Sequence, residues 1–121
     1  MYNATYWSSP GLAQYFKNKN YNELMYEWYI RYYGQHGGSI IDVGCGYGRN
    51  LIPFANNENY DVFCFDPCAD AVMYTAQRFG LSRHKYMIAP IQKMPWNNKK
   101  FDFVICDGVL HQQLSAEQFL D

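Results

Sequence analysis

The sequence lacks any long hydrophobic run and any strong excess of charge of one sign. No apolar stretch approaches the roughly 20 residues that a helix needs to cross a bilayer. The first residues hold no positively charged segment followed by an apolar stretch, so a secretory signal is not expected. The net charge is −1 at pH 7, which disfavours nucleic acids and anionic membranes as partners. These absences together predict a cytoplasmic protein.

Paired cysteines of the kind that bind zinc are also missing. The nearest two, Cys64 and Cys68, are separated by three residues, and Cys45 and Cys106 lie far from them in the sequence. Zinc knuckles commonly use CxxC-type pairs, so we expect no metal site. Four reduced thiols in a cytoplasmic protein are the simpler interpretation.

The residues that are present fit one globular domain. The chain has 121 residues, of which 49% are apolar and 17% charged, as in folded rather than disordered proteins. The aromatic fraction of 19% is high, and tyrosine supplies most of it. This tyrosine excess is concentrated before Tyr33, in the first third of the chain.

Two helices are predicted before residue 38. The first begins at Ser9-Pro10, where a capping residue precedes a proline, a combination typical of helix starts. The second runs from Asn22 to Tyr33, and Gly34 follows it. We expect its packing face to be the apolar stripe at offsets of three and four. The members of that stripe are Leu24, Met25, Trp28, Tyr29 and Tyr32.

Short apolar runs alternate with helical segments after residue 38. This alternation predicts a parallel sheet with right-handed crossovers and helices on both faces, an α/β doubly wound, Rossmann-like fold. Residues 1–38 then form an N-terminal helical region, and residues 39–121 form the core domain. The expected strands are 39–43, 61–66, 85–89 and 101–106, with helices at 49–55 and 67–79, a loop at 90–100 and a last helix from 115.

A glycine loop follows the first expected strand, where ligands bind in doubly wound sheets. Its glycines are Gly44, Gly46 and Gly48, and they let the backbone turn tightly and approach a ligand. A dinucleotide fingerprint requires a glycine at position 49, which is Arg49 here. Asp42 stands two residues before the loop, and its carboxylate suits a cationic amine better than a pyrophosphate.

Asp66 ends the second expected strand. An acid at this place can accept hydrogen bonds from both ribose hydroxyls of a nucleoside. The same side chain also suits a helix cap before Pro67, and we expect it to serve in both ways. The glycine loop and this acid together predict an adenosine-type cofactor without phosphates.

These features together resemble the class I S-adenosylmethionine-dependent methyltransferase family, in its small-molecule branch. The resemblance also includes Met94-Pro95-Trp96 before strand four and Val109-Leu110-His111 after it. It covers residues 39–120 and corresponds to the N-terminal part of the family's domain, so the expected sheet is truncated after its fourth strand.

The resemblance implies S-adenosyl-L-methionine as cofactor and a small-molecule methyl acceptor. Pro90 and Ile91 stand where the family often has an Asp and a small residue facing the adenine, and Gln92 is the candidate substitute. Cys106 and Asp107 would lie near the methionine part. The residues assigned to cofactor binding are Asp42, Gly44, Cys45, Gly46, Gly48, Asp66, Ile91, Gln92 and Asp107.

His111 is the candidate catalytic base, because histidine titrates near neutral pH. An ordinary surface role is the simpler alternative for this lone histidine, and Asp107 is a second candidate base. The N-terminal helices are candidates for a lid over the cofactor, through Tyr6, Trp7 and Tyr15.

Two other classes stay open at this point. One is a non-catalytic cofactor-binding module, or an inactive fragment that works through a partner. The other is a fragment of a dinucleotide oxidoreductase. If the sheet stops after strand four, that strand becomes an open edge, and such edges invite pairing with another chain. A partner chain or an oligomer is therefore expected there.

Overall fold

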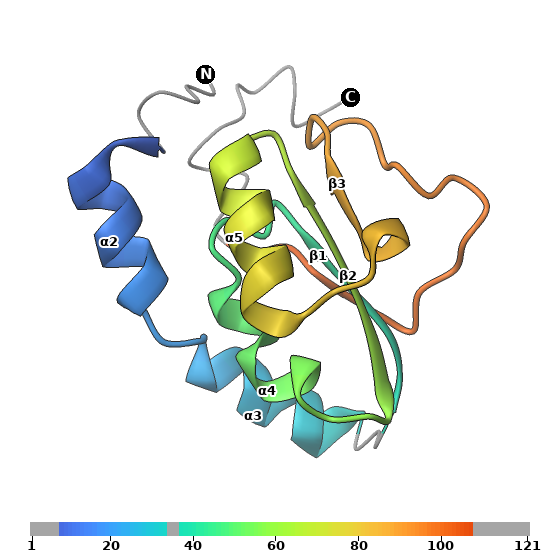
Figure 1. Ribbon diagram of the computed structural model, residues 1–121. Coiled ribbons are helices and arrows are strands. Elements are labelled where there is room, and N and C mark those ends of the chain that lie inside the picture. Colours follow the sequence, from blue (N-terminus) through green and yellow to red (C-terminus); the bar gives the residue numbers. More distant parts are fainter. Residues whose placement is uncertain (1–7, 34–36, 108–121) are drawn as a thin grey trace.

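The structure is a computed structural model, and it describes residues 8–33 and 37–107 of the chain. Helices and strands alternate along it after two N-terminal helices, as the sequence predicts (Figure 1). The elements are α2 (Pro10–Asn18), α3 (Glu23–Tyr32), β1 (Gly38–Val43), the 3₁₀ turn η1 (Arg49–Leu51), α4 (Ile52–Ala55), β2 (Tyr60–Asp66), α5 (Ala69–Phe79), the 3₁₀ turn η2 (Arg83–Lys85), β3 (Tyr86–Ile88) and β4 (Phe103–Ile105).

The four strands form one parallel sheet in the order β3-β2-β1-β4. β1 lies inside the sheet, and its Ile41 pairs with Phe63 of β2 and Val104 of β4. Parallel pairing brings the carboxyl ends of all four strands to one edge. This confirms the predicted Rossmann-like fold, of which the described residues contain these four strands.

Three helices cover one face of this sheet. Tyr29 of α3, Phe54 of α4 and Val72 of α5 share a buried cluster with Ile40 and Val62 of the strands. The ring of Tyr29 lies 5.3 Å from that of Phe54, edge to face. Aromatic pairs in this arrangement add packing energy to the area that they bury.

The opposite face is covered by the segment after β3 rather than by a helix. Trp96 lies 5.4 Å from Phe63 of β2, and Phe101 lies 5.2 Å from the same ring. The indole nitrogen of Trp96 donates a hydrogen bond to the His84 carbonyl at 3.1 Å. The predicted loop at 90–100 is confirmed. The helices expected on both faces lie on one face only within the part of the chain described.

The buried face of α3 differs from the predicted stripe. Tyr29 is 2% exposed, but Leu24, Trp28 and Tyr32 are 79%, 49% and 65% exposed. The prediction was wrong for these three because the helix is apolar on more than one side, so periodicity alone does not choose a face. The ring of Tyr29 packs between the strands and α4, and this contact determines which face is buried.

Element ends differ from the prediction by one to three residues. β3 and β4 are each three residues long, shorter than the apolar runs that contain them. α5 begins at Ala69 after the N-cap Cys68, so Pro67 precedes this helix instead of opening it. The helix expected from residue 115 and the candidate base His111 lie outside the described residues.

Candidate functional site

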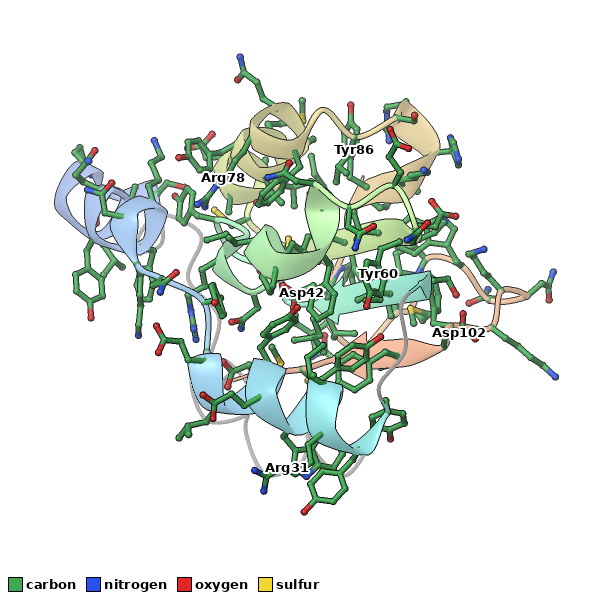
Figure 2. All side chains as sticks on the ribbon, turned by 90° about the horizontal axis from the view of Figure 1, so that it is seen from below. Arg31, Asp42, Tyr60, Arg78, Tyr86 and Asp102 are labelled. Carbon is green, nitrogen blue, oxygen red and sulfur yellow. The ribbon has the colours of Figure 1, made fainter. Side chains whose placement is uncertain are left out.

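A cavity lies at the carboxyl end of β1, where the glycine loop leads to η1. Asp42 lies near the carboxyl end of β1, whereas Tyr60 begins β2 and Asp102 immediately precedes β4; Figure 2 labels all three. The cavity combines the predicted loop with residues from α2 and α5. Its lining is Phe16, Lys19, Asp42, Gly44, Cys45, Gly46, Tyr47, Arg49, Asn50, Asp66, Cys68, Ala71 and Asp107.

The loop owes its shape to its glycines. Gly44, Gly46 and Gly48 have φ angles of 68°, 56° and 87°, a left-handed region that other residues enter only at a cost. The backbone N–H groups of Gly44 and Cys45 both donate to the carbonyl of Phe65, at 3.0 and 3.1 Å. These bonds attach the loop to the end of β2, so the turn is fixed beside Asp66.

Asp66 ties the loop to the start of α5. One carboxylate oxygen accepts a hydrogen bond from the Gly46 N–H at 3.0 Å, and the other accepts from the Cys68 N–H at 2.8 Å. Burial raises the pKa of Asp66, while these two amide donors oppose the rise. Each oxygen keeps a second lone pair for another donor, such as a hydroxyl.

Asp42 is a buried acid that lines the same cavity. Asp42 is only 2% exposed to solvent. Burial raises its pKa well above the usual range, and the charge of Asp66 adds to this while Arg49 opposes it. Two acids in a region of low dielectric constant attract a cation and repel a phosphate. The cavity therefore suits a ligand with a cationic amine.

Asp107 anchors a polar network at the end of β4. Its Oδ2 accepts hydrogen bonds from Arg49 at 2.9 Å, Asn50 at 3.0 Å and Asn22 at 3.2 Å. Burial raises the pKa of Asp107, but the hydrogen bonds from Asn50 and Asn22 and the charge of Arg49 outweigh it and lower the pKa overall. Asp107 is thus held as a carboxylate.

Asn50 and Asn22 were missed by the sequence analysis. Asn50 is 4% exposed, and its side-chain oxygen accepts from the backbone N–H of Asn22 at 2.8 Å. Asn22 also caps α3, because its side chain accepts from the Met25 N–H. The available signal was an asparagine two residues after Gly48; its burial, which makes partners for the amide necessary, is seen only in the structure.

Helix α2 closes the outer side of the cavity. Ala13 is buried against Tyr47, Cys68 and Ala71, and the ammonium of Lys17 lies 4.8 Å from the centre of the Tyr74 ring. Phe16 and Lys19 line the cavity, whereas the predicted lid residue Tyr15 is 58% exposed. Tyr6 and Trp7 lie outside the described residues.

Three of the predicted cofactor residues are not in the cavity lining. Ile91 is half-buried and Gln92 is exposed, both in the segment after β3. Gly48 is buried behind the loop, against α5. The predicted adenine contacts at Ile91 and Gln92 stay predictions.

Neither a metal cluster nor a membrane span is found in the described residues. No group of three or more His, Cys, Asp or Glu side chains among them could hold a metal ion. None of the helices in residues 8–33 and 37–107 has the length and apolar character to cross a membrane.

Similar folds occur in solved S-adenosylmethionine-dependent methyltransferases. A TehB-like enzyme of this class from Corynebacterium glutamicum matches 91% of this chain and 62% of its own, at 20% identity and a TM-score of 0.68. One from Methanococcus maripaludis matches 80% of this chain and 46% of its own, at 16% identity and a TM-score of 0.61. Coclaurine N-methyltransferase, solved with N-methylheliamine and SAH, matches 69% of this chain and 26% of its own, at 20% identity and a TM-score of 0.54.

These likenesses define the fold class, a Rossmann-like methyltransferase fold. The chain spans only part of each of these proteins, between about a quarter and two thirds of its length. The family model of the methyltransferase domain matches residues 40–121. The chain therefore belongs to the methyltransferase domain family, and the family expected from the sequence is confirmed. No curated protein matches the chain.

Proposed function

We propose that this domain binds S-adenosyl-L-methionine and supports transfer of its methyl group to a small-molecule acceptor. The observation that carries the proposal is the pair of buried acids, Asp42 and Asp66, on either side of a glycine loop in one cavity. The structural neighbours support it, because two are described as S-adenosylmethionine-dependent methyltransferases and a third was solved with SAH bound.

The two acids suit different parts of the cofactor. Asp66, fixed by two backbone donors, would accept hydrogen bonds from the ribose hydroxyls. Asp42 would lie near the cationic amine of the methionine part, whose charge favours the ionised carboxylate. Gly44 and Gly46 leave room for that part beside the backbone, and Cys45 lines the same wall. Ile91 and Gln92 remain the candidates for the adenine.

The bound cofactor supplies an electrophilic methyl group, and the protein's contribution is alignment. Holding two reactants in a reactive geometry can provide roughly 7–11 kcal/mol of a barrier. The lowered pKa of Asp107 makes its carboxylate a weak base, so its role would be to position groups at this end of the cavity. His111 stays the candidate base for an acceptor that must lose a proton.

The N-terminal region, residues 1–38, would act as a lid on this site. Its support is the position of Phe16 and Lys19 in the cavity lining and the packing of Ala13 on Tyr47. Ala13 is the one buried residue among those described in α2, so α2 could move without unfolding the sheet. Phe16→Ala should therefore weaken cofactor binding, while Tyr15→Ala, on the exposed side of α2, should leave it unchanged.

The outer edge of β4 would receive a further strand from a partner chain or a second copy. β4 pairs with β1 on one side only among the described strands, and Val104 is 52% exposed. Unpaired strand edges are ready templates for pairing.

A cytoplasmic location is also part of the proposed function.

Turnover is the direct test of methyl transfer. The full chain would be incubated with methyl-labelled S-adenosylmethionine and a panel of small amines, phenols and carboxylates, and SAH would be measured. We expect acceptor-dependent SAH that is lost in Asp66→Ala and kept in Asp61→Ala, which removes an acid at the far end of β2. Binding without turnover on any acceptor would favour a non-catalytic module. If the chain showed no binding and no turnover, the proposal would be refuted.

A further inference from the structure

The back of the glycine loop is held by helix α5. We infer that Thr75 and Arg78 are positioning residues that fix the cofactor loop through its carbonyl oxygens, without contacting the ligand themselves. This inference rests on the proposed binding of S-adenosylmethionine at that loop. Neither residue lines the cavity.

Thr75 donates a hydrogen bond from its hydroxyl to the carbonyl of Gly46 at 2.8 Å. In a helix, a threonine hydroxyl ordinarily bonds to a carbonyl one turn earlier in the same helix. Here it reaches across to the loop instead. Threonine is also a poor helix former, and this one is fully buried. A buried hydroxyl in α5 is therefore explained by its bond to the loop.

Arg78 lies one turn further along α5 and acts on the next carbonyl. Its Nη1 donates to the carbonyl oxygen of Tyr47 at 3.0 Å. The guanidinium also lies 5.2 Å from the centre of the Phe79 ring, which restricts its position. Figure 2 shows Arg78 on α5. Two successive carbonyls of the loop are thus held by two side chains of one helix face.

The contact between loop and helix is close enough to transmit this positioning. A Cβ atom added at Gly48 would lie 2.8 Å from the Thr75 methyl carbon and 3.0 Å from a ring atom of Phe79. Gly48 therefore lets the loop pack directly on α5. Since a peptide group is planar, fixing the Gly46 carbonyl also fixes the orientation of the following N–H, and so of the cavity wall.

Thr75 complements Asp66 in holding the two peptide groups on either side of the Gly46 Cα. Asp66 accepts from the N–H of Gly46, and Thr75 donates to its carbonyl. Gly46 has a φ of 56° and open space where a Cβ would lie, so side-chain packing on that side does not restrain it. Without the hydroxyl, the loop would sample other conformations and the free energy of ordering it would be subtracted from cofactor binding.

The test compares two substitutions of the same residue in the full chain. Thr75→Val keeps the shape and removes the hydroxyl, whereas Thr75→Ser keeps the hydroxyl and removes the methyl group. We expect Thr75→Val to raise the Kd for S-adenosylmethionine about tenfold, which corresponds to about 1.4 kcal/mol. Thr75→Ser should stay within about threefold of the wild type.

A core substitution controls for simple loss of stability. Val62→Ala removes buried volume from β2 on the helix-covered face, away from the loop, and should destabilise the fold without changing the Kd. If Thr75→Val had the wild-type Kd, or if Thr75→Ser and Thr75→Val weakened binding equally, the positioning role of the hydroxyl would be refuted.

Amide hydrogen exchange of the loop, measured without cofactor, gives a readout independent of binding. Thr75→Val should speed exchange of the amides of residues 46–49, and Thr75→Ser and Val62→Ala should not. If the wild type failed to bind S-adenosylmethionine, the proposed function would fall, yet this exchange pattern would still decide whether α5 fixes the loop. Unchanged exchange in Thr75→Val would overturn the inference.

Discussion

The two neighbours of β1 in the sheet, β2 and β4, differ in how extensively they pair with it. Towards β2, six residue pairs join the strands, and the glycine loop is hydrogen-bonded to the end of β2 beside Asp66. Towards β4, three pairs join them. The β4 side also carries an open groove, lined by residues of α3 and β4 that include Trp28, Tyr33 and Val104.

The difference shows which part of the proposed cofactor site is self-contained. On the β2 side, hydrogen bonds join the loop to Asp66, Thr75 and Arg78, all within residues 44–78. On the β4 side, Asp107 depends on Asn22 from the N-terminal region, and β4 has one neighbour. We therefore expect the β2 side to bind cofactor largely by itself and the β4 side to need further contacts.

The largest effect on stability is expected at Tyr29, which lies between the two sides. Its ring is 4.6 Å from that of Phe103 and 5.3 Å from that of Phe54. Tyr29→Ala should lower the free energy of unfolding by about 3–5 kcal/mol. Leu24→Ala, on the exposed face of α3, should change it by less than about 0.5 kcal/mol. Urea denaturation measures both, and similar losses would show that the buried face of α3 is wrongly assigned.

Gly48→Ala should have the next largest effect, on the β2 side. The new Cβ would contact Thr75 and Phe79, at a φ of 87°, so we expect a loss of about 2–3 kcal/mol from strain and crowding. Gly46→Ala is the matched control, because its Cβ meets open space at a φ of 56°, and it should cost about 1 kcal/mol. Equal losses in thermal or urea unfolding would contradict the close packing of the loop on α5.

Asp42→Asn should make the unliganded domain more stable at neutral pH. The pKa of Asp42 is raised in the fold, so its contribution to stability is present below its unfolded pKa and is lost as pH rises through the folded pKa. The amide avoids that loss, so we expect a gain in the free energy of unfolding that is largest at neutral and alkaline pH and disappears near pH 4.

The same substitution should weaken binding of S-adenosylmethionine. Urea denaturation at several pH values, with calorimetry at neutral pH, checks both expectations. For the wild type, binding should strengthen as pH rises, because the cation favours the ionised form of Asp42. If the difference in free energy of unfolding between the wild type and Asp42→Asn did not change with pH, Asp42 would not be the buried acid described.

The smallest effect is expected on the β4 side. Val104→Lys places a charge on an exposed position of the edge strand, so unfolding should change by less than about 0.5 kcal/mol. Self-association measured by analytical ultracentrifugation should decrease, since charges on edge strands oppose pairing. Loss of cofactor binding in this variant would contradict the independence of the two sides.

Sequence patterns predicted the central part of the fold well. Runs of β-branched and aromatic residues at 39–43 and 61–66 located β1 and β2, and the spacing of Gly44, Gly46 and Gly48 located the loop. The parallel pairing was predicted from the alternation of strands and helices and is confirmed, whereas the order β3-β2-β1-β4 was not predicted. The strands at the periphery were less well predicted, because β3 and β4 end where hydrogen bonding ends and not where apolar residues end.

Contacts between distant segments could not be predicted. The face of α3 that is buried depends on rings from α4 and β4, and the network around Asp107 joins residues separated by up to 85 positions. The position of Asn50 close to the glycine loop was visible in the sequence, but no pattern identified Asn22 and Asp107 as its hydrogen-bond partners. The choice of Phe16 rather than Tyr15 at the cavity depends on how α2 docks, which no pattern within α2 specifies.

The most direct test of the central claim is a calorimetric titration of the full chain with S-adenosylmethionine, beside Asp66→Ala and Asp61→Ala. The glycine loop and Asp66 predict one binding site with a Kd in the micromolar range, lost in Asp66→Ala and kept in Asp61→Ala. Binding of the same strength in Asp66→Ala, or no binding by the wild type, would contradict the assignment of this cavity as the cofactor site.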